Sequence, residues 1–500
     1  MLNKLIAIKI KNRIKLIQKA IENPIDYQDK ILTHNIAISK HTIFGKKHDF
    51  SSIKTYSQFT QKIPVHDYNS LKKYIDMARM GQKNILWPGT TKWFAKSSGT
   101  TKNKSKFIPI TTESLKECHF QAGKDMLSIY LNYYPNSKIL NGKSLMIGGS
   151  TSINKQNNYY TGDLSAIIIQ NLPQWVQLKR MPSIKTALID NWEHKIKKII
   201  EESKNKNITT ISGVPSWTIM IIDQIMKEKN TQCLGEIWPN LELYMHGGIS
   251  FEPYKNQFTN FMNSKKLNYL EIYNASEGFF GIQNDFAKND LLLLINHGIF
   301  YEFSPISTNH DTSRIQAIIP LEEVELNKTY AMIITTNGGL WRYQIGDTVT
   351  FTSLKPYKIQ ISGRTQSFIN AFGEELQENH ANTAINYACM QTNAIIQDYM
   401  AGPYFYDDKS GAHEWFIEFK KPPKNLAQFQ EIIDEKLKEL NCDYESKRKK
   451  SILLRKPIIH VLQKNFFYQM LKNQNKIGGQ NKIQRLHNNR NFISQLIKKV

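Results

Sequence analysis

Short apolar segments that alternate with helix-like stretches fill the middle of this chain, from about Trp87 to Phe351. Glycine, asparagine and proline bound these segments, as they commonly bound strands. Four of the strand candidates are residues 144–147, 208–211, 241–245 and 330–335. Strands that alternate with helices are typical of α/β domains, so the pattern predicts an α/β fold with a largely parallel sheet.

The N-terminal part of the chain, through Pro64, has a mainly helical pattern. Ile10, Ile14, Ile17 and Ile21 recur at helical spacing, and lysines interrupt the start before the apolar core of a signal peptide develops. This pattern predicts an amphipathic first helix. We expect the whole helical part to pack on the outside of the α/β domain.

A small separate domain is expected after the sequence Ser362-Gly363-Arg364-Thr365. A helix-like stretch at 375–390, a strand candidate at 414–419 and a helical pattern at 426–440 follow it. Gly363 is a candidate hinge, because glycine absorbs large backbone rotations. The predicted organisation is a large N-terminal domain, residues 1–363, and a small mobile α+β C-terminal domain, residues 364–500.

Length and cysteine usage limit the class of protein. Five hundred residues, 40% of them hydrophobic, suffice for two or three domains. The longest aliphatic run, residues 291–295, is far shorter than the roughly 20 apolar residues of a membrane helix. The cysteines lie far apart, so we expect neither a zinc site nor a disulfide framework, and a cytoplasmic location. They are Cys118, Cys233, Cys389 and Cys442.

The net charge of +23 raises the question of a polyanionic partner. Only 10 of the 66 basic residues are arginine, whereas base-reading and stacking sites favour arginine. The charge therefore indicates lysine spread over the whole surface. We interpret the run Lys447-Arg448-Lys449-Lys450 as a solvated loop or helix face. A basic protein that binds nucleic acid or a membrane surface stays as an alternative.

The first of three short motifs is a hydroxyl- and glycine-rich loop with lysines. Such a loop suits phosphate oxygens, because N–H and hydroxyl groups donate to them and ammonium groups supply charge. We expect Thr100, Thr101 and Lys106 to hold the β- and γ-phosphates, with Lys104 in a shared role. A solvated turn is the alternative, and the Walker pattern is absent. The motif is Ser97, Ser98, Gly99, Thr100 and Thr101, followed by Lys104 and Lys106.

The second motif, residues 273–277, places an aromatic residue four positions before a carboxylate. We expect Tyr273 to stack on the adenine, Ser276 to lie near the phosphate and Glu277 to coordinate Mg²⁺. The alternative is a buried tyrosine at a strand end, followed by a helix N-cap serine and its neighbouring acid.

The third motif, residues 343–347, ends in Gly346-Asp347. Asp347 is a candidate acceptor for the hydroxyls of a ribose, and the alternative is an ordinary turn aspartate. Together the three motifs describe a nucleotide bound in pieces by distant loops. Enzymes that activate a carboxylic acid as an acyl-adenylate bind nucleotide in this way.

A substrate pocket is expected beside the strand candidate 241–245. His246 and Gly247 follow it directly, and glycine at the carboxyl end of a strand suits a ligand crevice. Trp217 is assigned to the same pocket by neighbourhood. A satisfied core histidine is the alternative for His246. The GxSxG, HExxH and GxGxxG patterns are absent, so hydrolase, zinc-protease and dinucleotide functions have no motif support.

The three motifs in this order resemble the adenylate-forming ligase superfamily, and specifically the auxin-responsive acyl-acid amido synthetases, the Gretchen Hagen family. The first motif departs from the family pattern at Lys102-Asn103, where glycine is usual, although asparagine tolerates left-handed backbone conformations. The resemblance runs over nearly the whole chain, because it includes residues 42–48, 86–89, 212–217, 362–365 and 478–482.

This resemblance implies an enzyme that adenylates a small carboxylic acid with MgATP, releases pyrophosphate and conjugates the acyl group to an amino acid. It implies an active site between the two domains and small-molecule substrates. From the charge and the short apolar runs we expect no nucleic-acid or membrane partner. Carried over by motif, the phosphates would be bound by Ser98, Thr100, Thr101 and Lys106, with Ser276 also near the phosphate. Tyr273 would serve the adenine, Glu277 the Mg²⁺ and Asp347 the ribose. Arg364 would lie at the ribose and the hinge, and Lys482 would be the mobile C-terminal lysine.

Three alternatives stay open beside this function. An acyl-CoA ligase shares the adenylation half-reaction and differs only in the acceptor. A degenerate member of the family binds nucleotide without turnover. A non-catalytic basic binding protein is the third. The sequence does not predict the oligomeric state or the identity of the acid.

Overall fold

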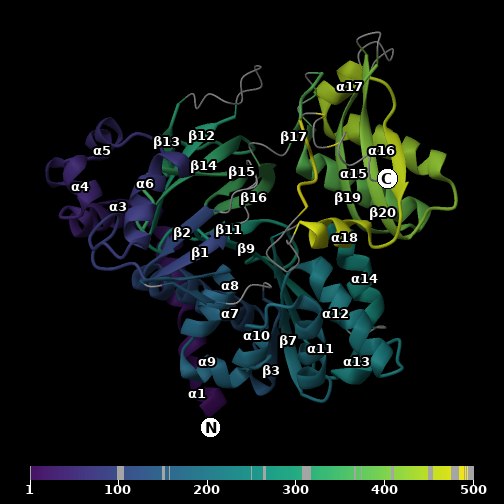
Figure 1. Cartoon of the computed structure of the whole chain (residues 1–500), viewed down its shortest axis with the longest axis horizontal. Helices are drawn as coiled ribbons and strands as arrows, with labels where there is room; N and C mark the ends of the chain where they lie inside the picture. The colour runs from purple at the N-terminus through teal and green to yellow at the C-terminus, as the bar shows by residue number, and fades with distance from the viewer. Residues whose placement is uncertain are drawn as a thin grey trace.

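Two domains of unequal size make up the structure, a computed structural model (Figure 1). The larger domain contains the N-terminal helices and the largest sheet, and the smaller one, at the upper right of Figure 1, contains most of the chain after residue 368. The structure describes residues 2–97, 106–148, 153–156, 158–248, 251–262, 266–306, 317–364, 368–372, 374, 376–406, 410–448, 454–474, 483–488, 490 and 493.

Helices open the chain, as the sequence predicts through Pro64. The first helix is shorter than the isoleucine pattern suggests, because a second helix begins at Ile14. Arg13 lies between the two helices, and its Nε donates a hydrogen bond to Asp125 Oδ1 at 2.6 Å. The opening helices are α1 (Leu2–Lys11), α2 (Ile14–Glu22), α3 (Pro24–Ser39), α4 (Ile43–Lys47), α5 (Tyr56–Lys62) and α6 (Tyr68–Arg79).

A 12-stranded sheet forms the centre of the large domain. Its order is β13-β12-β14-β15-β16-β11-β10-β9-β8-β7-β3-β6. The parallel part comprises β3 (Lys143–Met146), β6 (Arg180–Met181), β7 (Ile208–Ser212), β8 (Leu243–Gly247) and β9 (Asn268–Ala275). The antiparallel part comprises β10 (Gly278–Ile282), β11 (Leu291–Leu293), β12 (Ile299–Pro305), β13 (Ile319–Pro320), β14 (Thr329–Thr336), β15 (Tyr343–Leu354) and β16 (Tyr357–Arg364).

The prediction of a largely parallel sheet therefore holds for five strands only, and the sheet as a whole is mixed. Two-residue connections explain the difference. β9 and β10 are joined only by Ser276 and Glu277, and β15 and β16 only by residues 355–356. Such short turns produce antiparallel hairpins, because a parallel crossover needs a dozen or more residues.

A smaller four-stranded sheet carries the two ends of the first motif. It has the order β2-β1-β5-β4. β1 and β2 pair antiparallel, so that Ser97 lies opposite Lys106. The strands are β1 (Trp93–Ser97), β2 (Lys106–Ile110), β4 (Asn154–Lys155) and β5 (Tyr160–Gly162).

Helices between the parallel strands cover that half of the sheet. Trp192, Ile222 and Phe258, from three of these helices, share one buried hydrophobic cluster with Ile211 of β7. These helices are α8 (Leu164–Asn171), α9 (Gln174–Lys179), α10 (Ile184–Ala187), α11 (Trp192–Ser203), α12 (Pro215–Glu228), α13 (Leu234–Ile237) and α14 (Glu252–Met262), and α7 (Phe120–Tyr133) precedes β3.

The small domain packs helices on a three-stranded sheet of order β19-β20-β21. In its central helix, Phe429, Ile433 and Leu437 recur every four residues and are fully buried, which is the apolar stripe that the sequence predicts. Its elements are β17 (Phe368–Ile369), β18 (Leu376–Gln377), α15 (Glu378–Thr392), β19 (Ile395–Phe405), β20 (Gly411–Lys421), α16 (Leu426–Leu440), α17 (Cys442–Arg448), β21 (Ile458–Leu462) and α18 (Phe466–Asn473).

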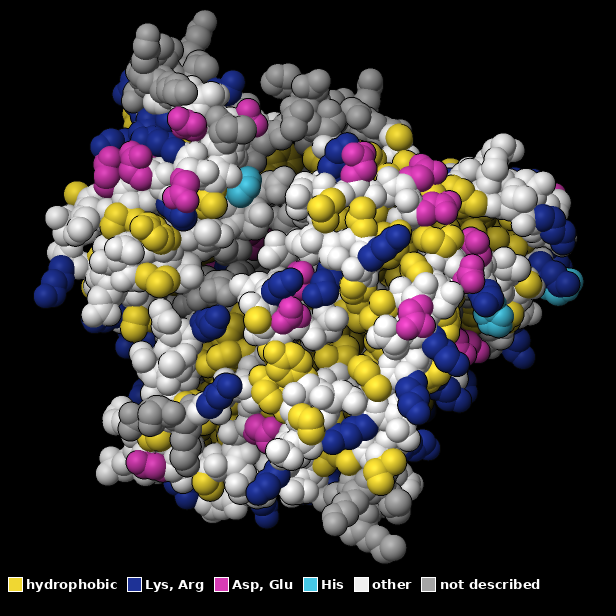
Figure 2. Space-filling view, turned by 180° about the vertical axis from the view of Figure 1, so that it is seen from behind, with side chains coloured by type: hydrophobic (Ala, Val, Ile, Leu, Met, Phe, Trp, Pro, Cys, Tyr) yellow, Lys and Arg dark blue, Asp and Glu magenta, His cyan; other side chains and the backbone are white. Residues whose placement is uncertain are grey.

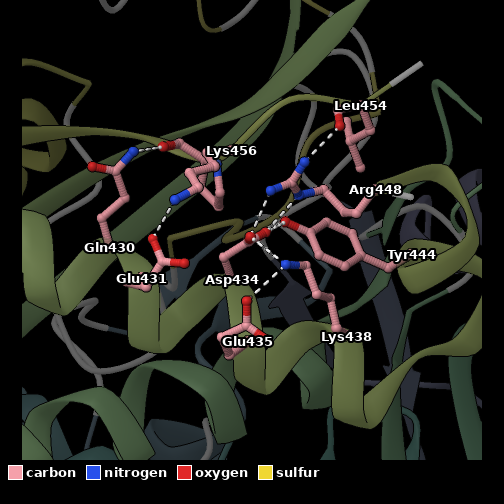
Figure 3. A network of polar contacts seen from close by, with 10 residues as sticks. Gln430, Glu431, Asp434, Glu435, Lys438, Tyr444, Arg448, Leu454 and Lys456 are labelled. Atoms are coloured by element: carbon pink, nitrogen blue, oxygen red, sulfur yellow. Dashed lines mark hydrogen bonds and ion pairs between the residues drawn. The ribbon is translucent and has the colours of Figure 1, made fainter. Parts of the chain in front are cut away.

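One polar network ties α16 to α17 (Figure 3). Asp434 is buried and accepts hydrogen bonds from Tyr444 Oη at 2.7 Å and from Arg448 Nε and Nη2 at 2.7 and 2.6 Å. The interpretation of the run at 447–450 as a solvated face is therefore wrong for Arg448, which is 5% exposed. Its bidentate partner lies 14 residues earlier, so the run of charges gives no sign of it.

The small domain rests on α12 and α14 of the large domain. Lys420 Nζ donates to Asp223 Oδ2 at 2.8 Å, and the buried Arg485 donates to Tyr254 Oη at 3.3 Å. β16 ends at Arg364 and the next described strand begins at Phe368. The domain boundary at residue 364, and the mobility of the small domain, stay predictions.

Lysine and arginine side chains are scattered over the face shown in Figure 2, with aspartate and glutamate among them. This distribution agrees with lysine spread over the surface. Among the described helices, none combines the length and the apolar character that crossing a membrane requires.

Candidate active site

The second and third motifs meet around the carboxylate of Asp347. Tyr273 Oη, on β9, donates a hydrogen bond to Asp347 Oδ2 at 2.7 Å. Arg364 Nε, at the end of β16, lies 3.1 Å from Asp347 Oδ1. The pairing of β15 with β16 produces this contact, because Asp347 and Arg364 are register partners. Asp347 is 8% exposed, and its charge raises the pKa of the Arg364 guanidinium.

Tyr273 is buried in this arrangement. Its ring meets the ring of Phe280 edge-on, with the centroids 4.9 Å apart, and its side chain is 5% exposed. Burial, followed by the neighbouring Asp347, raises the pKa of its hydroxyl, so the phenol keeps its proton and orients the carboxylate. Stacking of Tyr273 on an adenine stays a prediction.

The described part of the first motif lies against the same site. Lys106 begins β2, and its ammonium lies 5.9 Å from the ring centroid of Tyr68. Tyr68 Oη accepts a hydrogen bond from Phe107 N at 2.9 Å, which fixes β2 beside α6. Ser97 ends β1 opposite Lys106. The other motif residues, Ser98, Gly99, Thr100, Thr101 and Lys104, lie outside the described residues.

Glu277 joins the first motif to the second and third. Its carboxyl group is half-buried in the β9–β10 turn, beside Ser276, and burial raises its pKa. Lys106 and Arg364 oppose this shift, whereas Asp347 adds to it. Lys106, Glu277, Asp347 and Arg364 therefore act on one another electrostatically, although they come from four segments of the chain.

We predict that Glu277→Gln raises the stability of the protein without ligand at neutral pH. The raised pKa means that the folded state binds the Glu277 proton more tightly than the unfolded state. Stability is therefore lost as pH rises through the two pKa values, and an amide at this position removes that loss. Thermal unfolding of both proteins across the acidic and neutral range measures it. A midpoint difference that is the same at every pH contradicts the prediction.

Of the predicted substrate-pocket residues, Trp217 lies in the hydrophobic cluster beside the parallel strands, and His246 packs against that cluster. Trp217, on α12, is 6% exposed, and its ring centroid lies 4.8 Å from that of Trp192. His246, near the end of β8, stacks on Phe251 at 4.1 Å. Burial lowers the pKa of His246 to about 3, so its imidazole is neutral. Its Nδ1 has no hydrogen-bond partner among the described residues. A pocket role for these residues stays a prediction.

Gly247 is required by close packing. A Cβ at this position would lie 2.3 Å from the carbonyl oxygen of Ile272 on β9, so the two strands would have to separate. We expect Gly247→Ala to cost roughly 1–3 kcal/mol in the free energy of unfolding. Gly123→Ala is the matched control, because Gly123 lies in α7 with open space around its Cβ position and alanine favours helices. Chemical denaturation of both variants measures the contrast, and equal stabilities would contradict it.

The sequence motifs did not identify two further residues of the site. Tyr68 comes from α6 and supports Lys106. Glu378 begins α15 of the small domain, and its charge acts on Arg364. Both reach the site through long-range packing that leaves no local signal. Lys482, the predicted mobile lysine, lies outside the described residues.

The fold matches those of solved structures. Over 98% of this chain and 96% of the other, the structure matches AtGH3.15 acyl acid amido synthetase in complex with 2,4-DB, with a TM-score of 0.80 and 15% identity. It also matches 2-hydroxyisobutyryl-CoA ligase in the postadenylation state with R3-HIB-AMP, with a TM-score of 0.60, 11% identity and coverage of 94% and 91%. The fold is that of adenylate-forming ligases. The predicted α/β fold with a large N-terminal and a smaller C-terminal domain is confirmed.

The family follows from the sequence itself. Residues 13–267 match the GH3 family N-terminal domain, 292–364 its central domain and 379–491 its C-terminal domain. The chain therefore belongs to the GH3 family, which confirms the resemblance of the motifs. Indole-3-acetic acid-amido synthetase GH3.4 of Arabidopsis thaliana is 22% identical over 402 residues, or 68% of this chain. The match spans 66% of that relative's length.

Proposed function

We propose that this protein is an ATP-dependent acyl-acid amido synthetase, which joins a small carboxylic acid to an amino acid through an acyl-adenylate. One observation carries the proposal. Lys106, Glu277, Asp347 and Arg364 come from four separate segments, and their charges act on one another at one site. Family membership and the fold support the same reaction class.

The site residues fit a nucleotide and a divalent cation. Glu277 is a half-buried carboxylate at a turn, and carboxylate oxygens are ligands that Mg²⁺ prefers. An Mg²⁺ ion held there would neutralise charge on the phosphates. Asp347 keeps acceptor capacity for a ribose diol, because a carboxylate offers about four lone-pair sites and it has two partners among the described side chains. Arg364 is 43% exposed beside it and is able to turn toward the ribose.

In the first half-reaction a carboxylate oxygen of the acid attacks the α-phosphorus of ATP. A new O–P bond forms, and the bond to the pyrophosphate breaks. The ammonium of Lys106 stabilises charge that builds on the phosphates, and alignment of the reactants supplies much of the remaining acceleration. In the second half-reaction the amine of an amino acid attacks the acyl carbon, a C–N bond forms, AMP leaves and the amine loses a proton. The reaction requires no covalent enzyme intermediate.

An acyl-CoA ligase is the second candidate, and the structural match to 2-hydroxyisobutyryl-CoA ligase favours it. The two functions share the first half-reaction and differ in the acceptor. A cytoplasmic location and the absence of nucleic-acid partners remain expectations of both.

The test is pyrophosphate release with MgATP, over a panel of small aryl and alkyl acids, with amino acids, with CoA or with neither. Release that requires an acid and accelerates with amino acids supports the synthetase. Acceleration by CoA alone identifies the ligase. If no acid supports release although the protein is folded, the catalytic proposal is wrong, and thermal stabilisation by MgATP then distinguishes a nucleotide-binding relative from a basic binding protein.

A further inference from the structure

We propose that the hydroxyl of Tyr343 donates a hydrogen bond to a phosphate oxygen of the bound nucleotide, which makes Tyr343 a further substrate-contacting residue of this site. The inference rests on the proposed function. It adds a role to the third motif, in which Asp347 alone has one.

The hydroxyl of Tyr343 is buried and has no hydrogen-bond partner in the part of the chain that the structure describes. The side chain is 0% exposed, and its Oη has no hydrogen-bond partner among the described residues. Other fully buried tyrosines in this protein satisfy theirs: Tyr301 Oη donates to Leu294 O at 3.0 Å, and Tyr244 Oη donates to Gly213 O at 2.9 Å. Buried tyrosine hydroxyls usually find a partner, because an unpaired one destabilises the fold. Tyr343 is therefore an exception that calls for a ligand.

The hydroxyl lies among the groups of the active site. Its electrostatic neighbours are Glu277, Tyr68, Asp67 and Asp347. Tyr68 in turn lies under the ammonium of Lys106. The Tyr343 hydroxyl thus belongs to the part of the site where Lys106 and Glu277 are expected to hold the phosphates and the metal.

The same surroundings make the hydroxyl a donor. Burial and the nearby carboxylates raise the pKa of Tyr343, so the phenol keeps its proton at neutral pH. A protonated phenol donates most strongly to an anionic oxygen. Phosphate oxygens are such anionic acceptors, and we expect Lys106 and Glu277, with Mg²⁺, to hold the phosphates near this hydroxyl.

The backbone holds Tyr343 in place from both sides. His66 N donates to Arg342 O at 2.9 Å, and Gln344 N donates to His66 O at 2.9 Å. The start of β15 is therefore paired with the segment before α6. Because the backbone is paired and the side chain is fully buried, Tyr343 loses little conformational entropy when the nucleotide binds.

The test compares Tyr343→Phe with Tyr301→Phe, each of which removes one hydroxyl from a fully buried ring. The readouts are kcat/KM for ATP in acid-dependent pyrophosphate release, and the thermal unfolding midpoint with and without MgATP. We expect Tyr343→Phe to lower kcat/KM for ATP about 10-fold and to reduce the shift of the unfolding midpoint that MgATP causes. Without MgATP, its unfolding midpoint should be unchanged or higher. Tyr301→Phe should lower the midpoint and leave kcat/KM unchanged.

Two results would overturn the proposal. One is that Tyr343→Phe has the same kcat/KM for ATP as the wild type and the same shift of the unfolding midpoint with MgATP. The other is a ligand-free midpoint that falls as far as in Tyr301→Phe, because the hydroxyl would then have a partner in the protein. If the wild type is stabilised by MgATP but releases no pyrophosphate, the proposed function fails, and the MgATP shift alone decides the role of Tyr343. A wild type that MgATP does not stabilise refutes both.

Discussion

Lys106→Met should lower the kcat of acid-dependent pyrophosphate release by about 10²–10³-fold, which is the usual cost of removing one group that stabilises transition-state charge. Lys106 begins β2 in the small sheet and acts on the carboxyl of Glu277. Methionine keeps the length of the side chain and removes the charge. Because the side chain is only half-buried, the free energy of unfolding should change by less than about 0.5 kcal/mol.

The matched control is Lys96→Met, which removes the same charge from the exposed side of the same sheet. Its kcat should stay within about threefold of the wild type. Lys106→Met should also shift the MgATP-induced stabilisation to higher pH, because Lys106 lowers the pKa of Glu277 and its loss lets that carboxyl keep a proton longer. If Lys106→Met is as active as Lys96→Met, the proposed role of Lys106 at the phosphates is wrong.

Local pattern predicts the elements of this fold well. The helical pattern at 426–440 is α16 (Leu426–Leu440), and the strand candidate at 208–211 lies within β7 (Ile208–Ser212). In α16 a periodic apolar face, and in β7 a short buried segment, are defined by residues that are neighbours in the sequence. The antiparallel half of the large sheet is different. There Leu291 pairs with Ile359, and no local pattern encodes a partner so far along the chain.

The candidate site shows the same division. Asp347 and Glu277 are visible in the sequence, because each ends a short motif of unusual composition. That they meet depends on the arrangement of the whole sheet. Asp347 lies on β15, beside β16, whereas Glu277 follows β9, and β11 and β10 lie between β16 and β9. Tyr68 and Glu378 enter the site from helices whose own sequences serve packing, so nothing in those segments marks them.

The site is also less stable than a purely structural arrangement would be. Burial raises the pKa of Glu277, and Tyr343 buries a hydroxyl that has no hydrogen-bond partner among the described residues. Both features destabilise the free protein, and the proposed binding of Mg²⁺ and a nucleotide would resolve both. The variants Glu277→Gln and Tyr343→Phe should therefore share one signature, in which stability without ligand is kept or gained and stabilisation by MgATP is reduced.

Directly before Tyr343, Arg342 has a structural role with a large expected effect. Its guanidinium donates to Glu302 Oε2 and Oε1 at 3.0 and 2.9 Å and to Ile63 O at 2.7 Å. Tyr56 Oη also donates to Glu302, at 2.9 Å. Arg342 and Glu302 are 5% and 1% exposed. Arg342→Met should cost about 3–5 kcal/mol in the free energy of unfolding, because it leaves a buried carboxylate without its cation.

The pH dependence identifies the cause of that loss. Burial already raises the pKa of Glu302, and Arg342 opposes the shift, so Arg342→Met should raise this pKa further. The folded state then binds the Glu302 proton more tightly than the unfolded state, and stability falls as pH rises. Urea unfolding at about pH 5.5 and about pH 8 should therefore show the larger loss at the higher pH. The double variant Arg342→Met/Glu302→Gln should recover part of the stability, because no uncompensated charge remains buried. A pH-independent loss, equal in the single and double variants, would instead place the effect in the lost packing and hydrogen bonds around Ile63.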